Sequence, residues 1–152
     1  MILSHQLWED EAAIERWRND RQHKASQWAG RYTHFEDYRI RIAELLARVQ
    51  RGEPFSEVGS AANSAGSYIV AGHSRGRPLQ GFDESFASVN TEEAFVSLSS
   101  VSVLTDAYRL MEQVSRDSAM KWGFVARIIR DYGMFERTQA PQDYPPVKPG
   151  DA

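Results

Sequence analysis

The residues best suited to chemistry lie in one stretch, from Trp8 to Ile42. Residues 17–31 at its centre hold two of the chain's four Trp and one of its four His, with Arg and Lys between them. An imidazole can accept a proton near neutral pH, an indole offers an apolar stacking surface, and a guanidinium can stabilise an anion. We therefore expect any small-molecule site to lie in this stretch.

A second candidate is the Gly-x-Ser-x-Gly pattern at residues 72–76, with Ser74 at its centre. A nucleophile elbow needs a helix after the Ser, and an acid and a His later in the chain. Here the segment Arg-Pro-Leu-Gln-Gly follows at 77–81, and no His comes after His73. We interpret the pattern as a turn joining two strands, with a serine hydrolase as the weaker alternative.

The potential metal ligands form no motif. The four His, at positions 5, 23, 34 and 73, include no pair three or four residues apart. The chain has no Cys, which excludes disulfides, thiolate catalysis and zinc–thiolate sites. We predict no metal site.

Composition narrows the class of protein. The 152 residues suit one domain or two very small ones, and 41% apolar residues allow a hydrophobic core. A net charge of −3 argues against nucleic acid as a partner. No apolar run approaches the roughly 20 residues of a membrane span, and the first residues do not resemble a signal peptide. A cytoplasmic protein with no membrane partner is expected.

The elements that must position the candidate residues come first in the chain. Alternation predicts a strand over Ile2–Trp8, and the acidic residues 9–11 predict a helix start, with an apolar face at 13, 14 and 17. Asn19 with Gln22 predicts the cap of a second helix. Gly30 is expected to end it in a left-handed conformation, before a long strand over Tyr32–Val49.

The rest of the chain predicts a mainly β arrangement. We expect a linker at 51–66, then a strand Ser67–Gly72, a loop Ser74–Gly81 and a hairpin of Phe82–Val89 with Ala94–Val103. A helix from Thr105 and a short helix from Ser115 to Gly123 should follow. The chain should end with a strand Phe124–Phe135 and an extended, mobile tail at 139–152. The tail is rich in Pro.

The two halves share an order of elements: strand, two-piece helix, Gly, long strand. We interpret residues 1–50 as a partial repeat and 67–138 as a second one, separated by the linker 51–66 and followed by the tail 139–152. The matching residues are few, and chance agreement between amphipathic segments is the alternative.

One run of residues has a recognisable order. A Trp closes the first strand, an acidic Ala-rich turn follows, then Trp17, His23 six residues on, Ala, Gln, Gly-Arg at 30–31, and Tyr-Arg-x-Arg at 38–41. This order resembles the antibiotic biosynthesis monooxygenase (ABM) family of the dimeric α/β-barrel superfamily. Residues 129–141 also resemble a C-terminal extension of one branch of that family.

The resemblance implies an α+β fold. It implies a ferredoxin-like antiparallel sheet with helices on one face, in a homodimer of the α/β-barrel type. A family domain runs strand, helix, two strands, helix, strand. Here the first copy begins at its third strand, and the second has the loop Ser74–Gly81 where a helix belongs. The sequence therefore predicts an incomplete tandem repeat, either a fragment of a longer protein or two pieces that complete one another.

The resemblance also implies a site. It assigns catalysis to Trp17, His23 and Arg31, and substrate binding to Tyr38, Arg39 and Trp28, with an aromatic or quinone-like substrate. In such cofactor-independent oxygenases, His23 would take a proton from a polycyclic phenol, Trp17 would stack on it, and Arg31 or Arg39 would stabilise the anion. No cofactor is then needed.

Other interpretations of this segment stay open. Haem breakdown, another activity of the family, needs an axial His ten residues after Trp17, where Gln27 stands. A non-catalytic ligand-binding or dimerisation module of the same fold is the main alternative. In that case Trp17 packs in the core and His23 lies at the surface.

Overall fold

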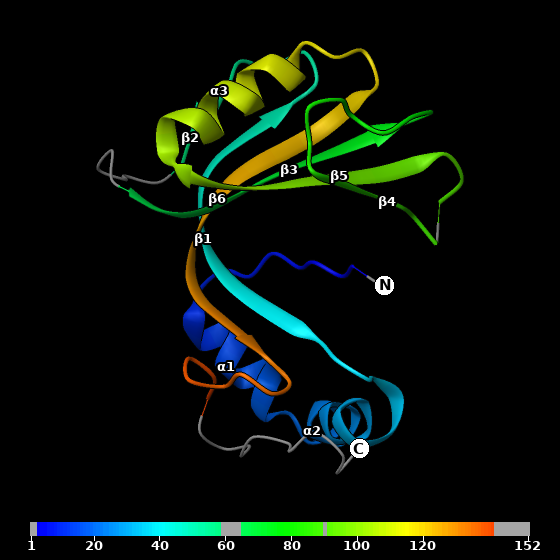
Figure 1. Cartoon of the computed structure of the whole chain (residues 1–152), viewed down its shortest axis with the longest axis vertical. Coiled ribbons are helices and arrows are strands. Elements are labelled where there is room, and N and C mark those ends of the chain that lie inside the picture. Colours follow the sequence, from blue (N-terminus) through cyan, green and yellow to red (C-terminus); the bar gives the residue numbers. More distant parts are fainter. Residues whose placement is uncertain (1–2, 59–64, 90, 142–152) are drawn as a thin grey trace. The chain divides into compact units, whose positions relative to one another are not determined.

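The computed structural model describes residues 3–58, 65–89 and 91–141 (Figure 1). The chain divides into two compact units. The sheet unit is Arg41–Arg130, and the helical unit is Met1–Ile40 together with Asp131–Ala152. Among the described residues, no helix has the length and apolar character needed to cross a membrane.

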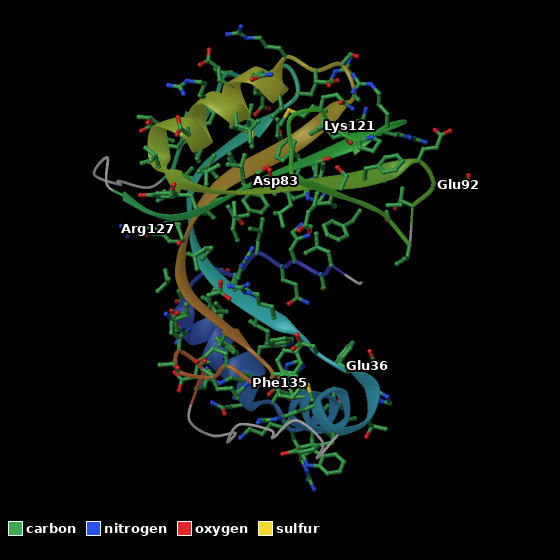
Figure 2. All side chains as sticks on the ribbon, in the orientation of Figure 1. Glu36, Asp83, Glu92, Lys121, Arg127 and Phe135 are labelled. Carbon is green, nitrogen blue, oxygen red and sulfur yellow. The ribbon has the colours of Figure 1, made fainter. Side chains whose placement is uncertain are left out.

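The described strands form one antiparallel sheet in the order β2-β1-β6-β3-β5-β4. β3 pairs antiparallel with both β5 and β6. The pairs β4–β5 and β1–β2 are also antiparallel. Arg127 of β6, labelled in Figure 2, lies 2.6 Å from Glu44 of β1. The strands are β1 (Arg39–Gln50), β2 (Ser56–Glu57), β3 (Ala65–Arg75), β4 (Glu84–Ala87), β5 (Ala94–Val103) and β6 (Met120–Gly133).

The core lies between this sheet and helix α3 (Leu104–Ser115). The helix buries Leu104, Ala107, Met111 and Val114, whose spacing of three, four and three residues forms one apolar stripe. Strand residues two apart face the same side, so Tyr68 and Val70 of β3 meet that stripe together. The predicted α+β class with an antiparallel sheet is confirmed.

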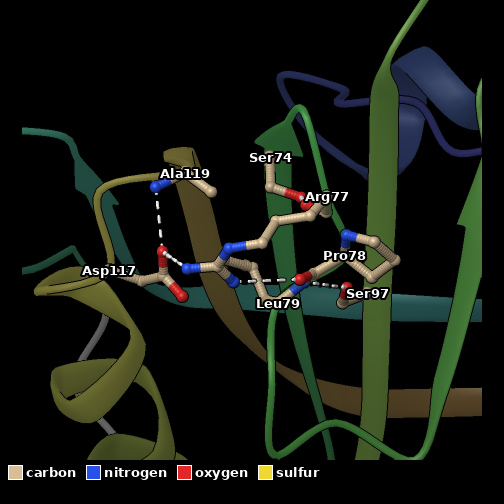
Figure 3. Close-up of polar contacts among 7 residues, drawn as sticks. All are labelled: Ser74, Arg77, Pro78, Leu79, Ser97, Asp117 and Ala119. Carbon is tan, nitrogen blue, oxygen red and sulfur yellow. Dashed lines mark hydrogen bonds and ion pairs between the residues drawn. The ribbon is translucent and has the colours of Figure 1, made fainter.

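A loop at residues 76–83 follows β3 and is held by polar contacts, some of which Figure 3 shows. Leu79 is buried in the core, and its N–H donates to Ser97 Oγ at 3.1 Å. Arg77 Nη2 lies 2.7 Å from Asp117. The hydrogen bond from the backbone N–H of Ala119 is the largest cause that lowers the pKa of Asp117, and the hydrogen bond from Arg77 lowers it further. Two buried serines of β5, Ser97 and Ser99, thus accept hydrogen bonds from the backbone of this loop.

The helical unit begins with two short helices and a single π-turn. Asp10 caps α1 (Glu11–Asn19), and Asp20 caps α2 (Arg21–Ala29). The chain continues into η1 (Gly30–His34). Neither α1 nor α2 has a buried residue, in contrast to α3. The unit also contains the start of β1 and the end of β6.

Four predictions for the first third of the chain are wrong in detail. Residues 3–10 form no strand, and Ile2 lies outside the described residues. The cap of α2 is Asp20, one residue after the predicted Asn19, because its carboxylate reaches the free N–H groups of the first turn. Gly30 stays right-handed (φ −57°), so helical structure continues to His34, and the strand starts at Arg39 instead of Tyr32.

The later predictions are closer. The β4–β5 hairpin and α3 are confirmed, although β4 is shorter than expected. The predicted helix from Ser115 to Gly123 is wrong: a turn at 116–119 leads into β6, which begins at Met120. The predicted linker contains β2, and residues 59–64 lie outside the described part, as does the tail from 142.

Candidate functional site

The clearest feature of the helical unit is a stack of two predicted site residues. The ring centroids of Trp17 and His23 lie 3.5 Å apart, with 29° between their planes. The break between α1 and α2 at Asp20 makes this contact possible. Asp20 Oδ1 accepts a hydrogen bond from His23 N at 3.0 Å, and Asp20 thereby caps the start of α2. The Trp8 ring lies 5.2 Å from that of Trp17. Aromatic rings of three segments are therefore gathered at one place.

The charge state of His23 suits proton acceptance. Burial lowers the pKa of His23 below its ordinary value of 6.5, and the nearby Asp20 carboxylate opposes this in part. The imidazole is therefore neutral at pH 7 and can accept a proton. Trp17 is 39% exposed, so the interpretation of this residue as core does not hold.

A second aromatic group is centred on Tyr32, which lies next to Arg31 and Trp28. The guanidinium carbon of Arg31 lies 5.7 Å from the centroid of the Tyr32 ring, within the range of a cation–π contact. The Trp28 ring lies 5.1 Å from the same Tyr32 ring. Arg31 is only 3% exposed, whereas Trp28 is 58% exposed. Two further predicted site residues, Trp28 and Arg31, thus share one neighbour.

Tyr38 is held by the C-terminal turn, residues 134–140. Its hydroxyl accepts a hydrogen bond from Arg137 Nη1 at 3.1 Å, and its carbonyl accepts from Met134 N at 3.0 Å. The Phe35 ring stands edge-on to it at 6.5 Å.

Arg39, the next residue, has a different partner. Its Nε and Nη2 each lie 2.7 Å from a carboxylate oxygen of Asp131. This hydrogen bonding raises the pKa of Arg39. The backbone N–H of Asp131 in turn donates to Gln139 Oε1 at 2.8 Å. The end of β6 therefore contacts Arg39, the first residue of β1, and the turn after β6 contacts Tyr38, the residue before it.

The six predicted residues thus form three groups: Trp17 with His23, Trp28 with Arg31, and Tyr38 beside Arg39. A shallow, open depression lies on α1 and the bend after it. None of the six lines it; its walls are Ala12, Glu15, Arg16, Asn19 and Asp20. The catalytic and binding roles stay predictions.

The other sequence candidates are placed as follows. Ser74 lies buried at the end of β3, and its Oγ donates to Arg77 O at 2.7 Å, with a loop and no helix after it. This matches the turn interpretation. Within residues 3–58, 65–89 and 91–141, no group of three or more His, Asp or Glu is arranged to hold a metal.

Sequence reasoning missed the partners that the end of β6 and the C-terminal turn supply. Arg137 is 99 positions from Tyr38, and Asp131 is 92 from Arg39. No spacing rule connects residues so far apart. The resemblance of residues 129–141 to a family extension was the one signal that pointed to this segment.

The comparisons with known proteins agree with the sequence resemblance. The chain is 27% identical over 169 residues to the jasmonate monooxygenase ABM of Pyricularia oryzae. The alignment covers 96% of this chain and 77% of that protein. No family model matches the chain, and no solved structure matches it significantly.

Proposed function

We propose that the chain, a distant homologue of the jasmonate monooxygenase ABM, is a cofactor-independent monooxygenase of the ABM family acting on an aromatic or quinone-like small molecule. The observation that carries this proposal is the stack of His23 on Trp17, with a histidine that is neutral at pH 7. The relationship to a monooxygenase supplies the reaction class, and the stack supplies a proton acceptor beside an aromatic wall.

The strand order supports the finer fold assignment. In the order β6-β3-β5-β4, the hairpin β4–β5 and the helix α3 between β5 and β6 are arranged as in a ferredoxin-like domain that lacks its first helix. In the first copy, α1 and α2 precede β1 as α3 precedes β6. We propose the incomplete tandem repeat on this basis.

A homodimer of the α/β-barrel type is part of the proposal. Because α3 covers one face of the sheet, alternation places the half-buried Trp122 and Phe124 on the other face. The mass of the protein in solution, by light scattering, tests this assembly. A monomer at all concentrations would contradict it.

The proposed chemistry uses the substrate as its own reductant. His23 removes a proton from a methylene activated by neighbouring phenols, which leaves an anion able to pass an electron to O₂. The balanced reaction is R₂CH₂ + O₂ → R₂C=O + H₂O, so no external electron donor enters. Trp17 stacks on the ring system, and Arg31 stabilises the anion. Trp28, Tyr38 and Arg39 are proposed to bind the substrate.

Oxygen uptake with 1,8-dihydroxyanthrone tests the proposal. We expect the His23→Gln variant to lose most turnover while keeping its circular dichroism spectrum, since the amide cannot take up a proton at pH 7. His34→Gln, at an exposed histidine of η1, is the matched control and should retain turnover. Equal rates for wild type and His23→Gln would remove His23 from the mechanism. Jasmonate belongs in the substrate panel because of the relative's name.

A non-catalytic ligand-binding module is the second candidate. One observation favours it: the shallow depression on α1 is lined by none of the six proposed site residues. The 39% exposure of Trp17 is against the packed Trp17 expected of such a module. Such a module would bind the anthrone, seen as quenching of Trp fluorescence, without consuming oxygen.

A further inference from the structure

The hydroxyl of Tyr38, the residue before β1, lies next to an arginine from the C-terminal turn. Arg137 reaches it from the C-terminal turn, with Nη1 3.1 Å from the phenol oxygen and 3.4 Å from Gly133 O. The same guanidinium lies 5.5 Å from the centroid of the Tyr132 ring. Arg137 is therefore fixed on several sides.

The turn that carries Arg137 is itself held in place. Gly133 N donates to Glu136 O at 2.7 Å, and Met134 N donates to Tyr38 O at 3.0 Å. The Glu136 carboxylate accepts from the backbone and the hydroxyl of Thr138. The position of Arg137 relative to Tyr38 is thus set by the backbone of the turn.

The direction of this hydrogen bond decides what Tyr38 can do. A guanidinium is only a donor, whereas a phenol both donates and accepts. Tyr38 is the acceptor here, so its own proton points away from Arg137. A phenol polarised by a cation is a stronger donor, and it favours an oxygen that carries negative charge.

The neighbouring cation, Arg39, does not fill this role. Successive residues of an extended chain point to opposite sides. Arg39 also directs Nε and Nη2 to Asp131. The cation that acts on Tyr38 thus comes from the far end of the chain.

We propose that Tyr38 donates its hydroxyl proton to an anionic oxygen of a bound aromatic ligand, and that Arg137 is its positioning residue. This inference rests on the proposed function for the location of the ligand, and it adds the chemical class: an aromatic carboxylate, or the phenolate formed when the substrate loses a proton.

The test compares 2-naphthoate with the neutral 2-naphthamide, titrated into the full chain and followed by Trp fluorescence. We expect Tyr38→Phe and Arg137→Gln each to weaken naphthoate binding about tenfold or more, since hydrogen bonds to charged groups are worth about 1.5–3 kcal/mol. Naphthamide binding should stay unchanged. Arg137→Lys, which keeps the charge, should recover part of the loss. Arg109→Gln, on the exposed surface of α3, is the control.

Other outcomes overturn the inference. Equal losses for both ligands would give the pair a structural role only, and unchanged naphthoate binding in Tyr38→Phe, or no binding by wild type, would refute it. If Arg137→Gln fails to fold, Tyr38→Phe still decides. Turnover of the Tyr38→Phe variant distinguishes the two kinds of anion. If Tyr38 contacts a carboxylate of the substrate, the variant should have a raised KM, and if it contacts the phenolate, the variant should have a lowered kcat. Naphthoate selectivity without oxygen uptake would refute the proposed enzyme and leave this inference standing.

Discussion

Arg39 and Asp131 face each other where β1 begins and β6 ends, joined by two contacts of 2.7 Å. The two-point geometry orients the two side chains relative to each other. The side chains are 66% and 22% exposed, so water and salt screen the attraction.

We therefore predict that Asp131→Asn lowers the free energy of unfolding by no more than about 1 kcal/mol. Urea denaturation at low and high salt measures this, and the loss should shrink at high salt. Asp106→Asn, in the exposed Asp106–Arg109 pair of α3, is the comparison. A loss that is large and independent of salt would mean that Asp131 has another structural role.

The pH dependence of turnover should report His23. Because burial lowers its pKa, the neutral imidazole persists to more acidic pH than in an ordinary histidine. We expect kcat/KM for the anthrone to rise with pH through a midpoint below 6.5, as the base loses its proton. The NMR titration of the His23 ring should give the same midpoint. A midpoint above 6.5 would contradict the proposed base.

Gly123 of β6 should tolerate no side chain. A Cβ there would lie 2.7 Å from Ala71 O and 3.0 Å from the terminal methyl of Met111. We predict that Gly123→Ala destabilises the protein by about 1–3 kcal/mol, as overpacking does. Thermal unfolding measures the change. Gly52→Ala does not serve as the control, because Gly52 has a φ of +83°; Ser102→Ala on the exposed side of β5 does.

Ser97 should matter more than a surface serine of the same strand. Its buried hydroxyl accepts from Leu79 N and lies 2.9 Å from Ser85 Oγ. Ser97→Ala leaves the Leu79 N–H unpaired inside the protein, which costs about 1–3 kcal/mol. Denaturant unfolding should show this loss, again with Ser102→Ala as the reference. Equal stability of the two variants would show that the loop does not depend on this bond.

Elements with a strong local pattern could be predicted from the sequence. The apolar stripe of α3 and the alternation of β5 are periodic signals, and each follows from burial on one face. Residues 3–8 also alternate, yet they form no strand, because alternation alone provides no pairing partner. Gly30 does not end its helix, because a Gly permits the left-handed conformation without requiring it.

The site was predictable only in part. Residue type and the family resemblance point to Trp17 and His23, but a spacing of six residues matches no helical repeat. The new helix that Asp20 caps brings the two rings together. The contact between Arg137 and Tyr38 could not be predicted from the sequence, because it depends on β1 and β6 being neighbours in the sheet. Long-range contacts of this kind follow from topology.

Helices α1 and α2 contain no buried residue, whereas α3 contains four. Short helices gain most of their stability from packing, so the amide hydrogens of residues 11–29 should be replaced by deuterium well before those of α3. The ring stack therefore sits on segments that open often. A ligand held between them would supply the missing order, and its binding should be visible as a slowing of that exchange.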